Sequence, residues 1–390
     1  MPQMRPHAPA LMAELERPPI VTEHDTGLAQ EPSRADIVGL LRMALEQRAS
    51  DLHMVVASPP ILRIDGALIR TEGPPLTRDD TKRLIYSLLS DRQKAYFERE
   101  QELDFSIAVQ DLGRFRINVH YQRGSVEAAF RIVPRKIRSL EELGLPPVVT
   151  ELTRKTNGLV LVTGPTGVGK TTTLAAMVDL INHDRSEMVI VIEDPIEYVF
   201  HHQRSIIKQR EVYSDTKSFA EALRRALRQD PNVIVVGEMR DLETIATALT
   251  AAETGHLVLA TLHTPDAPQT VDRILDVFPP YQQQQVKIQL ADCLQGVVSQ
   301  QLLPRLDRPG RVVAYEIMVA TPAVRHLIRE HATDQLPTVI QTGAQYGMCT
   351  MDNTLKELYH QGAISYETAV GHCKHPADFL PLSETRKRHR

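Results

Sequence analysis

The sequence predicts an α/β protein, in which a parallel sheet covered by helices follows a smaller α+β domain. Short apolar runs at 159–163, 188–192, 233–236 and 257–261 alternate with helical patterns at 170–183, 217–229 and 241–253. Such alternation is typical of a parallel sheet with both faces covered. A Gly-rich loop joins the first of these strands to the first helix. With 390 residues, the chain is long enough for two or three domains.

The first domain is expected over residues 34–133, after a flexible tail at 1–33 that is rich in proline and charge. Ser33 is placed to cap a helix whose apolar residues recur at helical spacing, namely Ile37, Leu40, Leu41 and Leu45. A second helical stretch covers 77–99, and strand patterns occupy 49–56, 61–64, 104–109, 114–119 and 126–133. Antiparallel strands with one or two helices make an α+β domain.

Arginines are prominent on the predicted strands of this domain. Arg114 and Arg116 lie two residues apart on one strand and therefore share a face, and Arg131 lies on a later strand. Two interpretations stay open. The arginines form a solvated sheet face, or they form a cluster that reaches phosphate oxygens, including those bound by a neighbouring subunit.

The prolines and charges of residues 134–147 predict an interdomain linker, which makes 148–372 the second domain. From residue 265 onward the pattern is mainly helical, at 268–276, 281–302, 321–331, 335–342 and 351–360. Residues 373–390 are expected to be a basic tail that ends in Arg386–Arg390. A solvated end is the simpler interpretation of that tail, and contact with an anionic membrane surface is the sharper one.

The Gly-rich loop carries the most specific motif in the chain. It has the pattern G-x-x-x-x-G-K-[ST] between a buried strand and a helix, the context in which this motif binds phosphates. Backbone N–H groups and the helix N-terminus can face phosphate oxygens, while Lys170 supplies a cation and Thr171 a hydroxyl for Mg²⁺. We expect a nucleotide to lie along Gly164, Pro165, Thr166, Gly167, Val168, Gly169, Lys170, Thr171 and Thr172. The alternative, a Gly-rich turn without a ligand, does not account for the spacing or the flanks.

Acidic residues follow two of the predicted parallel strands. Glu193 follows the strand at 188–192, and Glu238 follows the strand at 233–236 after Gly237. Because the carboxyl ends of parallel strands form the ligand-binding edge, both acids should face the same phosphates as the loop. We expect Glu238 to act as general base toward the attacking water and Glu193 to hold Mg²⁺ partly through water. The alternative is that Glu193 and Glu238 are ordinary surface acids. Gly237 departs from the generic P-loop pattern, which has an aspartate at this position.

Histidines bracket the fourth strand of this sheet. His256 precedes the run at 257–261 and His263 follows it. An imidazole near the terminal phosphate could sense it through a hydrogen bond, so both histidines are candidate catalytic residues. The alternative is that they are structural residues at the two ends of a strand.

Composition argues against several classes of protein. The formal net charge is −4, which does not favour a nucleic-acid-binding surface. We find no apolar run of roughly 18 residues that would span a membrane, and no apolar stretch of a signal peptide at the N-terminus. Cys293, Cys349 and Cys373 are too far apart in sequence to suggest a zinc motif or a disulfide framework. A cytoplasmic protein fits these features.

Four motifs together resemble one family, the secretion-superfamily ATPases that power type IV pili and type II secretion. Gly164–Thr171 is similar to its Walker A motif, and Glu193–Tyr198 is similar to its Asp box. Gly237–Asp241 resembles its Walker B motif, in which Gly-Glu replaces the generic aspartate, and Thr254–Thr264 resembles its His box. The resemblance extends over about residues 34–370.

Within this family, the chain is most similar to the PilT-like retraction ATPases of type IV pili. Four segments carry this similarity: Ala49–His53, Gly237–Thr244, Gly347–Asp352 and the C-terminal retraction motif at Pro322–Glu330. The last segment departs from the usual motif at Val324 and His326. The additional N-terminal domain and the four-cysteine zinc motif of assembly and secretion ATPases are not found.

The resemblance implies a RecA-like P-loop ATPase domain behind a PAS-like α+β domain. It implies a homohexamer that binds ATP and Mg²⁺ between subunits, with Arg116 and Arg131 at the positions of the arginines that the PAS-like domain lends to the site. It also implies a place at the cytoplasmic face of the inner membrane. The partners there would be the platform protein and the pilin machinery, with a paralogous retraction ATPase as a further partner and no nucleic acid.

Three alternatives remain at this point. A pilus-extension or type II secretion ATPase would share the same motifs. The number of pili on a deletion strain would separate a retraction ATPase from an extension ATPase. A RecA-like motor on nucleic acid would need a basic stripe, which the net charge of −4 does not favour. A nucleotide-binding scaffold without turnover would have little use for Lys170, Glu238 and the histidines together.

Overall fold

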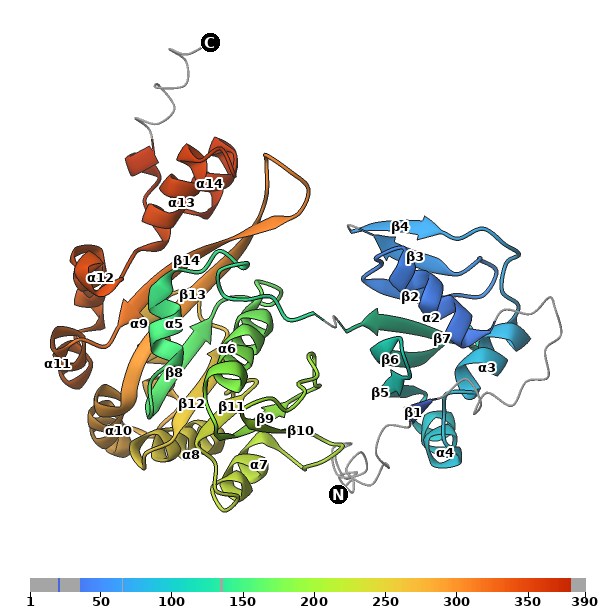
Figure 1. The fold of residues 1–390 in the computed structure, drawn as a ribbon, viewed down its shortest axis with the longest axis horizontal. Helices are drawn as coiled ribbons and strands as arrows, with labels where there is room; N and C mark the ends of the chain where they lie inside the picture. The colour runs from blue at the N-terminus through green and yellow to red at the C-terminus, as the bar shows by residue number, and fades with distance from the viewer. Residues whose placement is uncertain (1–19, 22–35, 65, 134–135, 380–390) are drawn as a thin grey trace, which may run out of the picture. The chain divides into compact units, whose positions relative to one another are not determined.

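The computed structural model describes residues 20–21, 36–64, 66–133 and 136–379. The chain forms two compact units and passes from the first to the second between Lys136 and Ile137. Figure 1 labels the helices and strands of both units. The tail predicted at 1–33 lies outside the described residues except for Ile20–Val21. The prediction of Ser33 as a helix cap is wrong, because the helix begins at Ile37 and its N-cap is Asp36, which accepts from the amide of Val38.

The first unit contains the strands β1 (Ile20–Val21), β2 (Asp51–Met54), β3 (Ile61–Ile64), β4 (Ala67–Arg70), β5 (Glu102–Val109), β6 (Gly113–Gln122) and β7 (Ser125–Ile132). They form one seven-stranded sheet in the order β1-β5-β6-β7-β2-β3-β4. Its pairs are antiparallel apart from β1 with β5. Phe115, Ile117 and Val119 of β6 are buried, so the alternating Arg114 and Arg116 lie on the opposite face.

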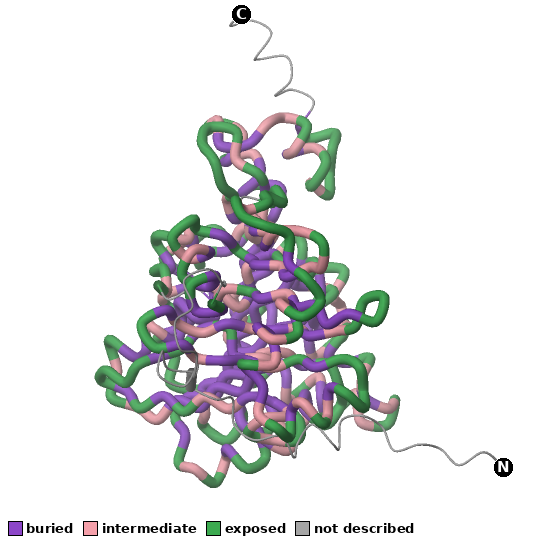
Figure 2. Tube along the Cα trace, turned by 90° about the vertical axis from the view of Figure 1, so that its right-hand side faces the viewer, coloured by how far each residue is buried: buried purple, intermediate pink, exposed green. Residues whose placement is uncertain are grey.

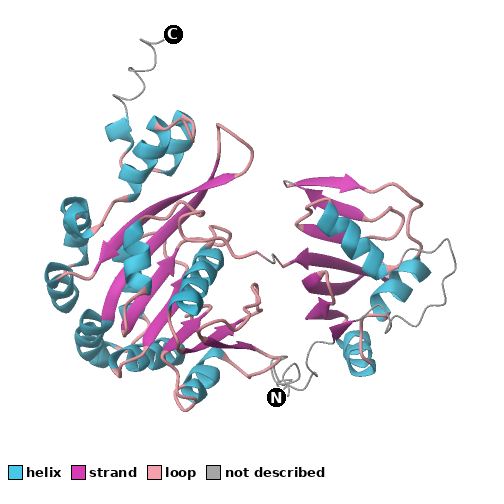
Figure 3. Ribbon diagram, in the orientation of Figure 1, coloured by secondary structure: helices cyan, strands magenta, loops and turns pink. Residues whose placement is uncertain are grey.

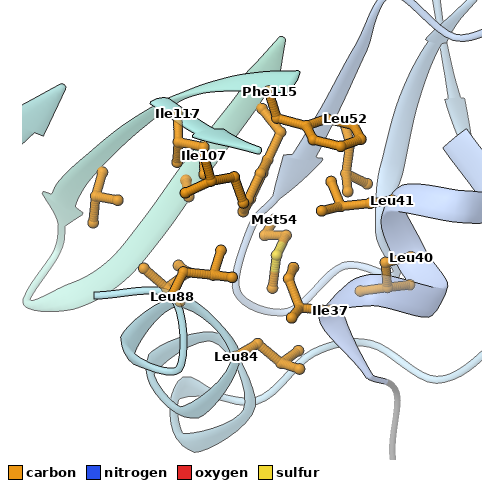
Figure 4. Packing of buried hydrophobic residues seen from close by; sticks show 14 of the residues in the cluster. Ile37, Leu40, Leu41, Leu52, Met54, Leu84, Leu88, Ile107, Phe115 and Ile117 are labelled. Carbon is orange, nitrogen blue, oxygen red and sulfur yellow. The ribbon is translucent and has the colours of Figure 1, made fainter. Parts of the chain in front are cut away.

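The core of the first unit lies between this sheet and the helices α2 (Ile37–Glu46), α3 (Arg78–Tyr86) and α4 (Asp91–Glu100). Figure 4 shows side chains of α2 and of the α3 region meeting Leu52 and Met54 of β2. The stretch predicted as one helix over 77–99 is two helices, because Ser90 and Gln93 form a capping box that begins α4. The first unit is therefore α+β as predicted, while its PAS-like character stays a prediction.

The second unit contains the strands β8 (Gly158–Thr163), β9 (Met188–Glu193), β10 (Ile206–Glu211), β11 (Val233–Val236), β12 (Leu257–Leu262), β13 (Leu294–Pro304) and β14 (Arg311–Val319). They form a sheet in the order β10-β9-β11-β12-β8-β13-β14, parallel except for the β13–β14 pair. Every residue of β8, β11 and β12 is buried, as expected for strands covered on both faces. The predicted α/β class is confirmed.

Helices lie on both faces of this sheet, as Figure 3 shows. They are α5 (Pro147–Thr153), α6 (Lys170–Asp184), α7 (Phe219–Ala226), α8 (Leu242–Glu253), α9 (Ala267–Asp276), α10 (Pro280–Cys293), α11 (Pro322–Glu330), α12 (Leu336–Thr342), α13 (Met351–His360) and α14 (Tyr366–His372). Gly296 of β13 faces α5, because a Cβ there would lie 2.8 Å from Leu152. Glu316, opposite Ser299, points to the other face and accepts from the amide of Ala267 in α9.

The helix predicted over 281–302 is wrong in its second half. Helix α10 ends at Cys293, and the chain continues as β13 between β8 and β14. The apolar repeat of this region fits either structure, and the close approach of Gly296 to Leu152 and pairing on both sides favour the strand. Strands β10 and β14 were likewise not predicted. Because of β13, the strand before the Gly-rich loop has neighbours on both sides.

The C-terminal region is also more structured than the prediction of a tail from residue 373 implied. A 3₁₀ turn, η3 (Pro376–Phe379), follows α14, and Phe379 is fully buried against Met351 and Leu355. Figure 2 shows buried and exposed stretches alternating along this part of the chain. Arg325 of the predicted retraction motif donates to the carbonyls of Ala291 and Asp292, so it closes the C-terminus of α10.

Candidate active site

The Gly-rich loop leaves the end of β8 and leads directly into α6. Gly169 is the N-cap of α6 with φ of 91°, a conformation that favours glycine. Gly164 has φ of 137°, and a Cβ there would lie 2.4 Å from the backbone oxygen of Gln300 on β13. A side chain at Gly164 would therefore push the loop away from β13, so this glycine is required by tertiary packing as well as by its dihedral angle.

The side chain of Lys170 lies inside this loop. Its Nζ donates to the carbonyl oxygens of Gly164 at 2.7 Å and Pro165 at 2.9 Å, and the residue is only 8% exposed. A buried ammonium needs such partners because desolvation disfavours its charge. The loop also holds Thr166, Gly167, Val168, Thr171 and Thr172, and contacts of these residues with a nucleotide remain predicted.

Glu238 and His263 meet beside Lys170. The Nε2 atom of His263 lies 2.9 Å from Oε1 of Glu238, and its Nδ1 atom lies 3.4 Å from Nζ of Lys170 and 3.5 Å from Oγ1 of Thr166. Since an ammonium only donates, Nδ1 acts as acceptor, and Nε2 carries the hydrogen that Glu238 accepts. One imidazole thus connects the predicted base to the loop lysine.

The carboxylate of Glu238 is held in its charged form. Burial by itself would raise the pKa of Glu238, but hydrogen bonds from Arg240 Nε and His263 Nε2 outweigh burial and lower it below the ordinary value. Glu238 is therefore ionised at neutral pH, as a general base must be. Its side chain remains 19% exposed, so solvent can reach it.

Glu193 ends β9 and is held by the neighbouring strand β10. Gln209 donates from Nε2 to Oε2 of Glu193 at 3.3 Å, while its Oε1 accepts from the amide of Phe200 at 3.0 Å. Glu211 accepts from the amide of Ile196 at 3.1 Å. Gln209 and Glu211 thus fix the loop after Glu193. From the sequence we predict no role for Gln209 or Glu211. Because they lie two residues apart on one strand, they share a face, and that spacing could have indicated a joint role.

The glycine before Glu238 is explained by close strand packing. A Cβ on Gly237 would lie 3.1 Å from the carbonyl oxygen of Ile192 and 3.3 Å from Cα of Glu193. The amide of Gly237 donates to that same oxygen at 2.8 Å, and its carbonyl accepts from Thr261 Oγ1 at 2.5 Å. Gly237 therefore lets β9, β11 and β12 end side by side, which aligns the acids with His263.

The residues at this edge fit Mg²⁺ bound with few protein ligands. Among the described residues, no group of three or more His, Cys, Asp or Glu side chains could hold a metal by itself. Mg²⁺ commonly keeps several waters and uses one or two side chains together with substrate phosphates. Thr171, in the first turn of α6, and the 7% exposed Glu193 are side chains of that kind.

His256 does not join this site. It precedes β12 at the end opposite His263, and six strand residues separate the two edges by about 20 Å. Its Nδ1 atom lies 3.0 Å from the carbonyl oxygen of Ala251, and its own carbonyl accepts from the amide of Gly158. His256 thus lies away from the loop lysine and fixes the beginning of β12 and β8, and a catalytic role for it stays a prediction.

The predicted arginines lie in the first unit. Nε of Arg131 donates to Oδ1 of Asp51 at 3.0 Å, and the other oxygen of Asp51 lies 3.9 Å from Nε of Arg63. Arg116 sits opposite Arg131 in the β6–β7 register, and we find no ion pair for it within the described part of the chain. Their role toward phosphates stays a prediction.

The chain matches the family described as type II/IV secretion system protein over residues 29–370. It is 48% identical over 344 residues to the type IV pilus retraction ATPase PilT of Pseudomonas aeruginosa, covering 88% of this chain and 100% of that protein. It is 40% identical over 333 residues to the pilus ATPase PilU of the same organism, covering 85% and 87%. The crystal structure of the pilus retraction motor PilT with bound ADP superposes with a TM-score of 0.83 at 50% identity, covering 88% and 99%.

Proposed function

The chain belongs to the family of type II/IV secretion system proteins, and from this premise we propose that it is the motor that retracts type IV pili by hydrolysing ATP. The observation that carries the proposal is the line of contacts from Lys170 through His263 to Glu238. It joins a phosphate-binding cation to an ionised base, which is what hydrolysis of a terminal phosphate requires. Likeness to PilT over its whole length supports retraction as the work that this hydrolysis drives.

The residues of the site divide the reaction between them. Lys170 would exchange its loop carbonyls for phosphate oxygens, and backbone N–H groups of the loop would hold the rest of the phosphate chain. Glu238 would orient the attacking water and accept its proton. His263 would keep Glu238 in place through Nε2, and a second proton on Nδ1 would let it donate to a terminal phosphate oxygen. Mg²⁺, when bound through Thr171 and through water by Glu193, would neutralise charge on the phosphates.

The first unit would complete the site in an assembled ring. We propose a homohexamer in which Arg116 and Arg131 reach phosphate oxygens, where planar guanidinium groups offset the charge that develops during transfer. The ion pair of Arg131 with Asp51 leaves its side chain 68% exposed, which is compatible with a second partner. Substituting Arg116 with alanine should lower turnover without changing folding.

The proposed setting is the cytoplasmic face of the inner membrane. Within the described ranges, no helix combines the length and apolar character needed to cross a bilayer. The partners would be the platform protein and the pilin machinery, with a paralogous retraction ATPase beside them and no nucleic acid. Identity of 48% to PilT against 40% to PilU favours the main retraction motor over the accessory one.

Two measurements test the proposal. Purified protein should release phosphate from ATP in the presence of Mg²⁺, and chelation of Mg²⁺ should stop the release. A deletion strain should carry more surface pili and lose twitching motility, because extension continues without retraction. A deletion strain without pili would instead identify an extension ATPase, and release stimulated by DNA would identify a nucleic-acid motor.

A further inference from the structure

The segment that follows α14 is anchored by backbone hydrogen bonds. We call residues 373–379 the C-terminal clasp. The amides of Lys374 and His375 donate to the two carboxylate oxygens of Asp352, at 2.8 and 3.0 Å. Asp352 is 6% exposed and lies in the first turn of α13. With Phe379 buried at its other end, the clasp has a defined position on the second unit.

The side chain of Lys374 joins two buried carboxylates. Its Nζ atom lies 3.0 Å from Oδ2 of Asp266 and 3.2 Å from Oε2 of Glu316. These two side chains are 8% and 4% exposed, whereas Lys374 covers them from the surface and is 41% exposed. Burial alone would lower the pKa of Lys374, but Glu316 and Asp266 raise it above its usual value. Lys374 is their shared counter-charge.

These carboxylates fix the beginning of α9. Asp266 is its N-cap and accepts from the amide of Gln269 at 2.9 Å, and Oε1 of Glu316 accepts from the amide of Ala267 at 3.0 Å. The segment just before this point carries His263. Glu316 also lies opposite Ser299, whose Oγ accepts from Thr163 at the start of the Gly-rich loop. The acids that Lys374 neutralises thus hold the beginning of α9, and Glu316 is the strand partner of the residue that bonds Thr163.

We propose that Lys374 is a positioning residue for ATP hydrolysis, holding the beginning of α9 so that His263 stays between Glu238 and Lys170. This inference rests on the proposed function. Without Lys374, two buried carboxylates lose their counter-charge and repel each other, which displaces the segment before α9. A displacement of about 1 Å at a catalytic group can slow turnover about 100-fold.

The test compares kcat and KM for ATP in full-length Lys374→Met, Lys374→Arg and the double variant Glu316→Gln/Lys374→Met. We expect Lys374→Met to lose about 10- to 100-fold in kcat with KM within about twofold of wild type, because the phosphate-binding loop is intact. Arginine restores the cation and should recover kcat. The double variant removes one carboxylate together with the cation, and it should recover kcat as well.

Lys356→Met is the matched control. Lys356 pairs with Asp378 of the clasp and lies over the ring of Phe379, but it does not contact Asp266 or Glu316. This variant should lower the melting temperature and leave kcat unchanged. If Lys374→Met does not fold, Lys374→Gln takes its place in the same comparison.

Two results would overturn the inference. One is a folded Lys374→Met protein with wild-type kcat, and the other is a double variant no faster than Lys374→Met. In the second case, loss of the clasp rather than uncompensated buried charge would explain the defect. Failure of the wild-type protein to hydrolyse ATP would overturn the proposed function itself, and the two failures are therefore distinguishable.

Discussion

His263 and His256 flank the same strand, yet they contact different groups. His263 follows β12 and contacts Glu238 and Lys170. His256 precedes β12 and contacts the carbonyl of Ala251 at the end of the neighbouring helix. The difference teaches that position relative to strand direction, and not residue type, decides membership of the site. In a parallel sheet only the carboxyl edge collects loops that can enclose a ligand.

The largest expected effect on phosphate release separates the two lysines that flank β8. Lys170 follows the strand at the site edge, and the exposed Lys155 precedes it at the edge of His256. Lys170→Ala should reduce phosphate release about 10³-fold, because the phosphate charge loses its buried cation. Lys155→Ala should leave release unchanged. Comparable rates in the two variants would remove the functional distinction between the edges.

Carboxylates offer the second comparison. Glu238→Gln should still bind nucleotide but hydrolyse it about 10²- to 10³-fold more slowly, because an amide cannot accept the proton of the attacking water. Glu253→Gln is the control, since Glu253 ends α8 near His256 and accepts from Gln289 at 2.6 Å. Nucleotide affinity and single-turnover hydrolysis would be measured together. Normal hydrolysis by Glu238→Gln would assign the base elsewhere, with Glu193 next.

Substitution of the two histidines should have different effects, on kcat for His263 and on stability for His256. His263→Ala should lower kcat about 10-fold or more, because Glu238 loses a donor that orients it. His256→Ala should leave kcat unchanged and cost about 1 kcal/mol of stability, the usual loss for one hydrogen bond. Kinetics and thermal unfolding of both variants check this expectation. A kinetic defect in His256→Ala would show that this histidine acts in a site after all.

The smallest effect concerns the pH dependence of the site edge. Burial alone would raise the pKa of Glu238, and Arg240 and His263 reverse that shift. In Arg240→Ala the carboxylate loses one of the groups that lower its pKa, so the pKa of Glu238 should rise. As pH falls, activity should therefore be lost at a higher pH than in the wild-type protein. The sign follows because Glu238 must be ionised to act as base, and a raised pKa protonates it earlier as pH falls. An unchanged acid limb in the kcat–pH profile would argue that another group limits activity there.

Local patterns in the sequence were sufficient for the Gly-rich loop and for most parallel strands. Strands β8, β9, β11 and β12 each contain the apolar run that predicted them, because a strand covered on both faces leaves little room for polar residues. The capping box at Ser90 was also visible in the sequence, yet the helical pattern of 77–99 concealed it. Site residues on the Gly-rich loop are nearest neighbours in sequence, so their spacing alone brought them together.

By itself, then, the sequence determined the fold class, the phosphate-binding loop and which acids follow parallel strands, since these depend on periodicity over a few residues. Only the tertiary structure decided that residues 294–304 form a strand, that Gln209 holds Glu193, and that Lys374 neutralises Asp266 and Glu316. It also decided which of His256 and His263 lies beside Glu238 and Lys170. The physical reason is common to all four cases. Strand pairing, strand direction and the cost of buried charge join residues far apart in sequence, and no local pattern records which distant partner each of them meets.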